Sequence, residues 1–286
     1  MRILTLEYDL YKAVLAPQEG ACLVSLHRNG REVFRNCNDS GDLPLGAACF
    51  PCVPYFGRLY DGLHFAGRQW KDLKATLSEA SELPLHGHGW IAPWTIISHT
   101  ASSALLRHDF TPKKQGDFPF AYGATQNISL DDNGLSIELT VENTGTSPMP
   151  VGSGLHPFFK RSPETCLQFK AAQFWFPPTN GNDGVLGPLP SRLGSSLNAP
   201  LPKHTLDHAF AGFNGNLVIS NPGQTIQLSS NAPILHIYAP AGEDFFCAEP
   251  VSHLPGQLTD PETGFGGHIL EPGETTSLAM VISHSE

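Results

Sequence analysis

The chain has 286 residues, of which 40% are hydrophobic and only 15% are charged, and this composition excludes a disordered protein, which needs low hydrophobicity and high net charge. Its 17 basic and 27 acidic residues give a formal net charge of −10 with no basic run longer than two, so no nucleic-acid or anionic-membrane partner is expected. The 28 glycines and 25 prolines are spread along the chain and leave little room for long helices. We therefore expect an all-β protein.

The N-terminal residues and the cysteines predict a cytoplasmic protein with reduced thiols. Glu7 and Asp9 interrupt the region where a signal peptide needs a continuous apolar run. Six cysteines in a chain of this length are too few for a disulfide scaffold. Cys49 and Cys52 form a C-x-x-C pattern, but no second pair completes a zinc ribbon, and Pro54 disfavours the helix of a thioredoxin-type site. We expect reduced, mostly buried thiols.

Two Asn-Gly pairs predict tight β-hairpins. Asn29-Gly30 separates the strand-like residues 22–27 from residues 31–34, and Asn133-Gly134 precedes residues 135–142. Asn-Gly tolerates the positive φ angles of a type I′ turn. Residues 135–142 alternate strictly between apolar and polar, which predicts a strand with one face on the core.

The rest of the chain also contains short strand-like runs. Further strand-like runs, each bounded by Gly, Pro or Asn, are residues 217–220, 225–228, 234–238 and 277–282. No segment has a convincing helical period, and no internal repeat, charge block or Ser-rich linker marks a boundary. The sequence predicts one domain over residues 1–286, a large antiparallel β-sandwich.

Five segments lack any clean periodicity and are rich in Gly, Pro, His and aromatic residues. They are residues 49–72, 83–94, 150–162, 174–210 and 239–267. In β domains such segments form loops and strand ends over a rigid sheet, where binding residues collect. Aromatic rings mixed with histidines and acids suit a neutral polar ligand.

The common catalytic and metal motifs do not occur. The sequence has no P-loop, no dinucleotide G-x-G-x-x-G before a helix, no H-E-x-x-H and no G-x-S-x-G. His86 and His88 could share one face of a strand and hold a metal ion, but residues 89–95 supply no carboxylate to complete the site. We therefore predict no metal site and no cofactor.

Two titratable residues stand out from the others. His156 follows Gly154 and precedes Pro157 in an apolar segment that would fix its rotamer. Glu249 lies at an apolar strand end, where a buried carboxylate needs a partner or a chemical role. Most other histidines are expected at the surface or in loops: His27, His64, His99, His108, His204, His236, His253, His268 and His284.

Five separated motifs, in this order, resemble those of the aldose 1-epimerases, also called galactose mutarotases. They are Phe50–Leu59 with Asp61-Gly62, then Leu85–Trp90, Gly154–Phe159, Asp207–Phe210 and Glu249-Pro250, and the resemblance runs from about Tyr8 to Ile282. It implies a galactose mutarotase-like supersandwich of antiparallel strands. It also implies a cofactor-free enzyme, a monomer or homodimer, that interconverts the α and β anomers of a free monosaccharide.

The resemblance also implies roles for the two titratable residues. Glu249 corresponds to the general base that takes the proton of the anomeric hydroxyl, and His156 to the general acid that protonates the ring oxygen. Aromatic neighbours such as Phe158 and Phe245 should raise the pKa of the carboxyl and lower that of the imidazole, whereas Asp207 would oppose the second shift.

Three further residues match the family's substrate-binding positions. Arg58, His86 and Asp207 would hold sugar hydroxyls and the ring oxygen by charge-assisted hydrogen bonds. His88 and His208 flank two of these positions and are expected to contribute indirectly at most.

Two departures from the family pattern bear on the substrate. Gly57 stands where many relatives have asparagine, and Trp90 stands where the hexose-6-phosphate branch has arginine. Because an indole cannot neutralise a phosphate, we expect a free hexose such as galactose or glucose. The alternatives are a hexose-6-phosphate mutarotase, a carbohydrate-binding sandwich without catalysis, and a glycosidase that uses Asp207 and Glu249.

Overall fold

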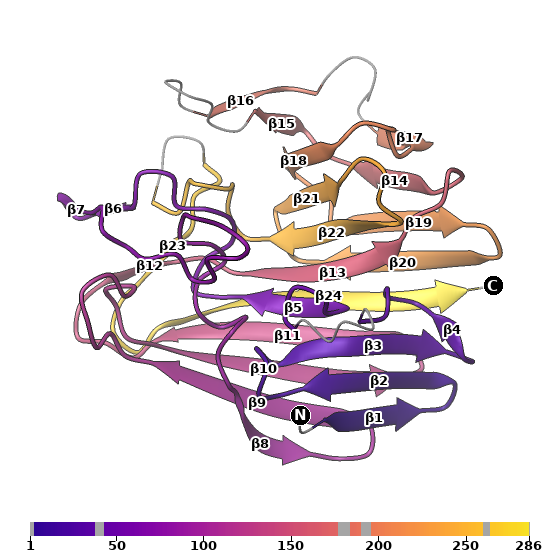
Figure 1. Cartoon of the computed structure of the whole chain (residues 1–286), viewed down its shortest axis with the longest axis horizontal. Helices are drawn as coiled ribbons and strands as arrows, with labels where there is room; N and C mark the ends of the chain where they lie inside the picture. The colour runs from indigo at the N-terminus through magenta and orange to yellow at the C-terminus, as the bar shows by residue number, and fades with distance from the viewer. Residues whose placement is uncertain (1–2, 38–42, 177–183, 190–195, 260–263, 286) are drawn as a thin grey trace.

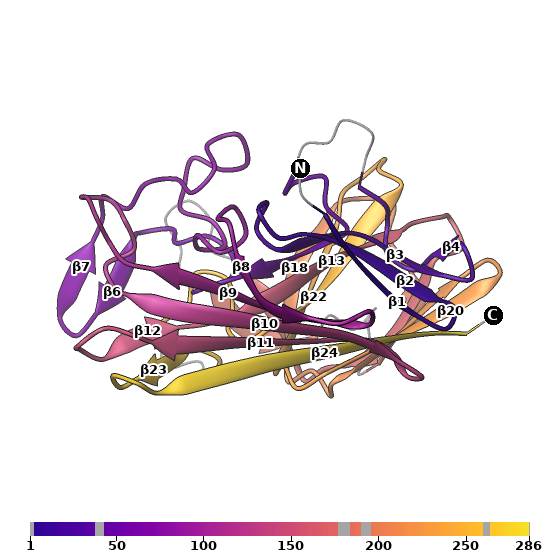
Figure 2. The ribbon, with the colours of Figure 1, turned by 90° about the horizontal axis from the view of Figure 1, so that it is seen from below.

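Two large antiparallel β-sheets make up most of the molecule (Figures 1 and 2). The computed structural model describes residues 3–37, 43–176, 184–189, 196–259 and 264–285. No residue in these ranges is helical, so they contain no helix that could cross a membrane. The predicted all-β antiparallel sandwich is confirmed.

The first sheet has 11 strands and carries the site described below. Its order is β1 (Leu4–Tyr8), β2 (Tyr11–Ala16), β3 (Cys22–Arg28), β5 (Cys49–Cys52), β13 (Gly154–Lys160), β22 (Phe245–Val251), β21 (Ile234–Ala239), β18 (Leu206–Ala211), β15 (Gln173–Phe176) and β16 (Val185–Pro188), with β4 (Arg31–Glu32) paired to β3. Strands from both halves of the chain therefore meet at its centre, where β5, β13 and β22 are neighbours.

The second sheet has nine strands and packs against the first. Its order is β17 (Ser196–Pro200), β14 (Cys166–Lys170), β19 (Asn216–Asn221), β20 (Gln224–Ser230), β24 (Thr275–Ser285), β11 (Gly134–Asn143), β10 (Tyr122–Asp131), β9 (Ser103–Phe110) and β8 (Thr95–His99). Two short ladders lie beside the sheets: β12 (Met149–Val151) with β23 (His268–Leu270), and β6 (Leu63–Phe65) with β7 (Arg68–Trp70).

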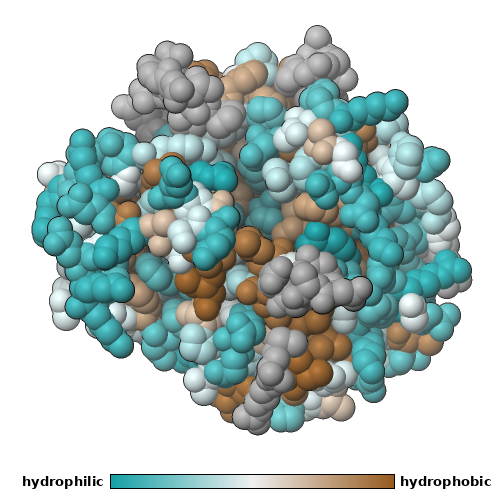
Figure 3. Space-filling view, viewed as in Figure 1, coloured by the Kyte–Doolittle hydropathy of each residue, from teal (hydrophilic) through white to brown (hydrophobic). Residues whose placement is uncertain are grey.

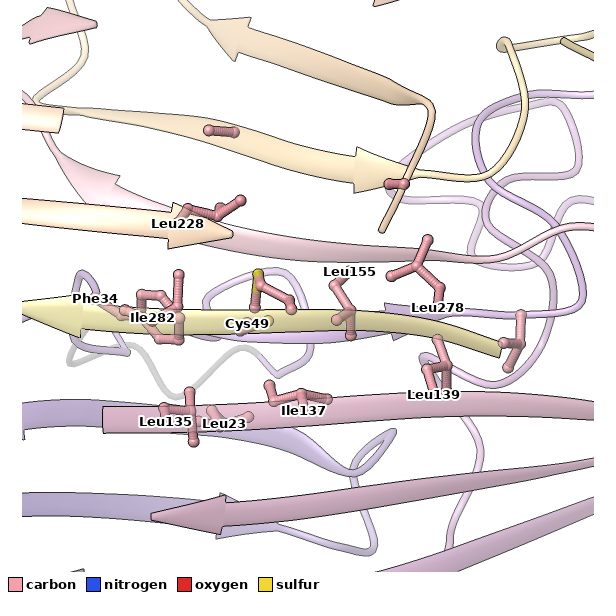
Figure 4. Packing of buried hydrophobic residues seen from close by; sticks show 14 of the residues in the cluster. Leu23, Phe34, Cys49, Leu135, Ile137, Leu139, Leu155, Leu228, Leu278 and Ile282 are labelled. Atoms are coloured by element: carbon pink, nitrogen blue, oxygen red, sulfur yellow. The ribbon is translucent and has the colours of Figure 1, made fainter. Parts of the chain in front are cut away.

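The inner faces of the two sheets form the hydrophobic core. Leu23 and Leu155 from the first sheet lie close to Ile137, Leu278 and Ile282 from the second, all of them buried (Figure 4). Each fully buried aliphatic side chain of this size contributes roughly 1.5–3 kcal/mol. A slip of one residue in register would turn such a set toward solvent, so burial fixes the register.

The two predicted hairpins form, but only one has the predicted turn. Asn29 and Gly30 have φ angles of 50° and 76°, as a type I′ turn requires. At the second hairpin Asp131 pairs with Gly134, and of the turn residues only Gly134 has a positive φ, at 111°. The type I′ prediction is wrong here, because the amide of Asn133 donates to Asp131 Oδ1 at 2.7 Å and fixes a different turn.

The predicted strands are found, and several are longer than expected. The runs at residues 217–220, 225–228, 234–238 and 277–282 lie within β19, β20, β21 and β24. In the first hairpin, by contrast, β4 ends at Glu32, so residues 33–34 lie outside it.

The prediction of loops and strand ends in the aperiodic segments is partly wrong. β5, β13 and β22 run through three of them, and their residues are almost all buried. A strand buried on both faces has no apolar–polar alternation to reveal it. The parts of these segments at residues 177–183, 190–195 and 260–263 lie outside the described residues.

The described cysteines form no disulfide, and Cys22, Cys49, Cys52 and Cys247 are buried. The expectation that most of the thiols are buried is therefore confirmed.

Candidate active site

A cavity of about 360 Å³ opens where β13, β18, β21 and β22 meet the segments that follow β5. This volume is in the range of small-molecule sites. The space-filling view shows a hollow near the middle of this face, with hydrophobic residues along its lower rim (Figure 3). Its polar lining consists of Arg58, His86, His156, Asp207, His236 and Glu249. All five residues singled out from the sequence therefore line one cavity.

The cavity also has a mostly apolar wall. Its lining residues include Leu45, Phe50, Leu85, Trp90, Phe158, Tyr238 and Phe245. Aromatic rings next to a few convergent polar groups can cover the apolar faces of a sugar ring while its hydroxyls are hydrogen-bonded.

His156 and Glu249 form a pair at the buried end of the cavity. His156 lies on β13 and Glu249 on the neighbouring strand β22, and His156 Nε2 is 3.4 Å from Glu249 Oε2. Cross-strand pairing places Phe50 opposite His156, and the imidazole stacks on the rings of Phe50 and Phe158 at centroid distances of 4.4 and 4.8 Å. The aromatic contacts hold the imidazole where it faces the carboxyl.

Burial shifts both members of this pair toward their neutral forms. It raises the pKa of Glu249 well above its ordinary value, and the negative charge of Asp207 adds to this effect. Burial, with a smaller contribution from the positive charge of His236, lowers the pKa of His156 to about 3. Both directions agree with the expectation from the aromatic neighbours. Both shifts favour a protonated carboxyl on Glu249 next to a neutral imidazole on His156.

His86 is held by the backbone of Gly57. The amide of Gly57 donates to His86 Nδ1 at 3.1 Å, and the amide of His86 donates to the carbonyl of Gly57 at 3.0 Å. Burial, with smaller contributions from the neighbouring His156 and the guanidinium of Arg58, lowers the pKa of His86 well below its ordinary value. A neutral imidazole that accepts at Nδ1 carries its proton on Nε2, so Nε2 is a hydrogen-bond donor.

The turn around His86 depends on glycine. His86 and Gly87 both have positive φ angles, of 56° and 68°, and a Cβ on Gly87 would lie 2.0 Å from the carbonyl oxygen of Val53. The indole Nε1 of Trp90 donates to the carbonyls of Leu85 and Gly87, at 3.1 Å each. This network presents the imidazole to the cavity without a strand to support it.

Asp207 and His236 form a second histidine–carboxylate pair at the cavity mouth. His236 Nε2 and Asp207 Oδ1 are 2.9 Å apart. Partial burial raises the pKa of Asp207, but the hydrogen bond and charge of His236 together with the charge of Arg58 outweigh it, so the pKa lies below its ordinary value. Asp207 is therefore an ionised acceptor at neutral pH.

Arg58 is half-buried and enters the cavity beside this second pair. An isolated bridge to Leu85 joins its segment to the turn that carries His86. The preceding Gly57 has a φ of 72°, and a Cβ there would lie 3.1 Å from the Cβ of Pro255. Pro255 therefore leaves little room for a side chain at this position.

Three histidines expected at the surface or in loops are buried within strands instead, and that prediction is wrong for them: His108, His236 and His284. His253 lies in a loop, as expected, but it is also buried. His236 is the one that reaches the cavity, and it pairs in register with Glu249 of β22. The signal was present in the sequence, because His236 interrupts an apolar strand as Glu249 does, but the same pattern also suits a structural histidine.

His253 has such a structural role. Its Nε2 accepts from the amide of Phe56 at 3.0 Å, and its Nδ1 donates to the carbonyl of Leu254 at 2.8 Å. A Cβ on Gly152 would lie 2.0 Å from the His253 ring, so only glycine fits there. Both ring nitrogens of His253 are hydrogen-bonded to the backbone, and the bond to Phe56 fixes the segment that leads to Gly57 and Arg58.

His88 and His208 lie outside the main cavity. His88 stacks on Phe110 at a centroid distance of 4.6 Å, while His208 lines an adjoining cavity of about 80 Å³. His86 and His88 therefore do not share a metal-binding face.

The arrangement suits acid–base chemistry on a small polar molecule. A carboxyl and an imidazole lie in contact at the buried end, and Arg58, His86 and the Asp207–His236 pair surround the space in front of them. Each can hold a hydroxyl in place while a proton moves at the buried end.

Comparison with known proteins gives the same family over the whole chain. The sequence profile of the Aldose 1-epimerase family matches residues 2–283. The uncharacterized protein YphB of Escherichia coli K12 is 31% identical over 297 residues, which cover 98% of each chain. A crystal structure from Escherichia coli K12, described as a candidate aldose 1-epimerase, superposes with a TM-score of 0.88 at 30% identity and covers 99% of each chain.

A more distant structure agrees in fold alone. Galactose 1-epimerase from Lactobacillus acidophilus NCFM superposes with a TM-score of 0.73 at 18% identity, covering 99% of this chain and 94% of its own. The family match, the relatives at 30% identity and more, and the shared fold lead to one conclusion: this chain belongs to the aldose 1-epimerase family.

Proposed function

We propose that this chain is a cytoplasmic aldose 1-epimerase that interconverts the α and β anomers of a free hexose such as galactose or glucose. The observation that carries the proposal is the contact of 3.4 Å between His156 Nε2 and Glu249 Oε2 at the buried end of a cavity sized for one sugar. Neither proton transfer requires a cofactor, because each exchanges a proton between a side chain and a sugar oxygen.

Catalysis begins with a proton transfer inside the pair. The single proton on Glu249 moves to His156 Nε2, which leaves a carboxylate base next to an imidazolium acid. The carboxylate then takes the proton of the anomeric hydroxyl, the C1–O5 bond breaks, C1=O1 forms, and the imidazolium protonates O5. Both side chains are now neutral again, as they were before the reaction.

Ring closure on the other face reverses these steps. After rotation about the C1–C2 bond, His156 takes the proton from the O5 hydroxyl as that oxygen attacks C1, and Glu249 protonates O1. The apolar wall that keeps the resting pair neutral also strengthens the hydrogen bonds that form when charge develops.

The remaining polar residues would orient the sugar. His86 Nε2 and the Arg58 guanidinium are donors, and the ionised Asp207 is an acceptor held by His236. A hydroxyl that both donates and accepts can be held between Asp207 and one of these donors. This set discriminates against a molecule that lacks the hydroxyl, because the donors would be left unpaired.

Trp90 favours a free hexose over a phosphorylated one. Its indole nitrogen already donates to two backbone carbonyls, and the ring is fully buried. Arg58 is the only arginine or lysine among the described lining residues, and its charge already acts on the neighbouring Asp207.

Polarimetry on freshly dissolved α-D-glucose and α-D-galactose tests the proposal. The protein should accelerate the approach to equilibrium rotation for at least one sugar. Glucose 6-phosphate serves as the comparison substrate, and a nitrophenyl glycoside tests for hydrolysis. Rates equal to the buffer blank for both free hexoses would reject the proposed function.

A further inference from the structure

A third residue with a metal-binding side chain lies against the buried pair. Cys247 and Glu249 are two residues apart on β22, so their side chains project from the same face of the strand. The neighbouring strand β13 pairs Phe158 with Cys247 and Gly154 with Val251, which brings His156 to the level of Glu249. A His nitrogen, the Cys sulfur and a carboxylate oxygen all lie within 4.8 Å of one another.

We propose that His156, Cys247 and Glu249 form a binding site for a soft divalent cation of the Zn²⁺ or Cd²⁺ type, and that the cation and the sugar exclude each other. Thiolate, imidazole and carboxylate are the ligands that Zn²⁺ takes in proteins. Zn–ligand bonds of about 2.0–2.3 Å in a tetrahedron place neighbouring ligand atoms roughly 3.3–3.7 Å apart. The His156–Glu249 distance of 3.4 Å already meets this spacing.

The cavity supplies the rest of the coordination shell. His156 and Glu249 both line it, so an ion bound to them would keep its fourth position open toward the cavity for water. The same nitrogen and oxygen carry the proton in the proposed reaction. An ion on these atoms therefore removes the acid and the base together.

Charge balance also favours a divalent ion over a monovalent one. Zn²⁺ with one thiolate and one carboxylate has no net charge. The guanidinium of Arg35 is nearby and lies 4.3 Å from the rings of both Phe158 and Phe245. A neutral metal complex adds no positive charge that would repel this guanidinium. The charged and titratable groups that act on Cys247 are Glu249, Arg35, Cys49 and Asp207.

Binding must release protons, which gives the site a second signature. Burial raises the pKa of Cys247 well above its ordinary value, so the thiol is protonated in the empty site, and Glu249 holds the proton of the pair. One ion therefore displaces two protons, one from sulfur and one from the carboxyl, and forms one metal–sulfur and one metal–oxygen bond. The affinity should rise steeply with pH.

The test measures Cd²⁺ and Zn²⁺ binding to the whole protein by equilibrium dialysis, and the absorption of the Cd²⁺–thiolate bond. We expect one ion per chain, proton release on binding, and displacement of the ion by the better hexose substrate. Cys247→Ala and Cys247→Ser should weaken binding at least tenfold and abolish the thiolate absorption, and thermal melting without metal checks that both variants fold.

Cys49→Ala is the matched control. Cys49 is a buried thiol on β5, next to β13, but it is outside the described group of ligand atoms. The Cys49→Ala variant should bind Cd²⁺ as the wild type does. Wild-type affinity in both Cys247 variants, or no binding to the wild type, would overturn the proposal. The affinities of the wild type and the variants are measured without a sugar, so their outcome stands apart from the polarimetry; only the displacement of the ion by a hexose rests on the proposed function.

Discussion

Two histidine–carboxylate pairs line one cavity, and they differ in how deeply they are buried and in the distance between their two side chains. In the buried pair, Glu249 and His156 have side chains that are 2% and 11% exposed and lie 3.4 Å apart. In the pair at the mouth, the Asp207 side chain is 51% exposed and lies 2.9 Å from His236. Each pair joins a histidine to a carboxyl, but depth and distance differ.

The difference decides the charge of each carboxyl. Burial raises the pKa of Glu249, whereas at Asp207 the effect of partial burial is outweighed by the bond to His236 and by Arg58. In the proposed reaction the buried pair therefore supplies a transferable proton, and the pair at the mouth supplies a fixed negative charge. Under this proposal, solvent access separates the proton-transfer pair from the binding pair.

The largest effect is expected for Glu249→Gln. The amide keeps the shape and removes the proton acceptor, so kcat should fall by about 10²–10⁴ while KM stays within a few-fold. Polarimetry on the better hexose measures both. Since the folded-state pKa of Glu249 is raised, its ionisation costs stability as pH rises, and the Gln variant should be at least as stable as the wild type at alkaline pH. A near wild-type kcat would remove Glu249 from the reaction.

The next effect concerns stability and tests a histidine whose pKa shift has burial as its largest cause. Burial lowers the pKa of His253 to about 4, so the unfolded chain binds a proton at this residue below pH 6.5 that the folded chain does not. Its contribution is present above pH 6.5 and is lost as pH falls toward 4, on the order of 3 kcal/mol in the free energy of unfolding.

Urea unfolding of the wild type and His253→Gln between pH 4.5 and 7.5 measures this contribution. The variant should be less stable at neutral pH and show a weaker dependence on pH. His99→Gln, at an exposed position, is the control and should follow the wild type. Parallel curves for the wild type and His253→Gln would contradict the assignment.

A smaller effect is expected at the mouth. Asp207→Asn keeps a hydrogen-bonding group but removes the negative charge, so KM should rise about tenfold with kcat changed less than KM, as for a lost charge-assisted hydrogen bond. Steady-state polarimetry separates the two constants. If kcat falls as far as in Glu249→Gln, the two pairs do not have the separate roles described here.

The smallest effect is expected when kcat/KM is measured as a function of pH between 5 and 6.5. The pair stays active while it holds one proton; it gains a second only near pH 3, where His156 titrates, and loses the first where Glu249 ionises. Acidification from pH 6.5 to 5 should therefore change kcat/KM by less than about twofold, with circular dichroism checking the fold. A clear fall over this range would show an imidazole titrating at its ordinary pKa.

Much of the fold class followed from local patterns. The alternation of residues 135–142 and the Asn-Gly turns predicted antiparallel strands, because side-chain direction and positive φ are local properties. β13 and β22 were not predicted as full strands, since burial on both faces removes alternation. The turn at Asp131 differed because a side-chain hydrogen bond selected its geometry.

The sequence by itself determined which residue types stand at Arg58, His86, His156, Asp207 and Glu249, and their motifs indicated that they belong to one site. Only the tertiary structure brought His156 to within 3.4 Å of Glu249, added His236 to Asp207 and buried Cys247 behind the pair. These contacts depend on which strands become neighbours and in what register. Their depth below the surface then sets the sign of each pKa shift, and depth is a property of the packed sheets rather than of any segment of the chain.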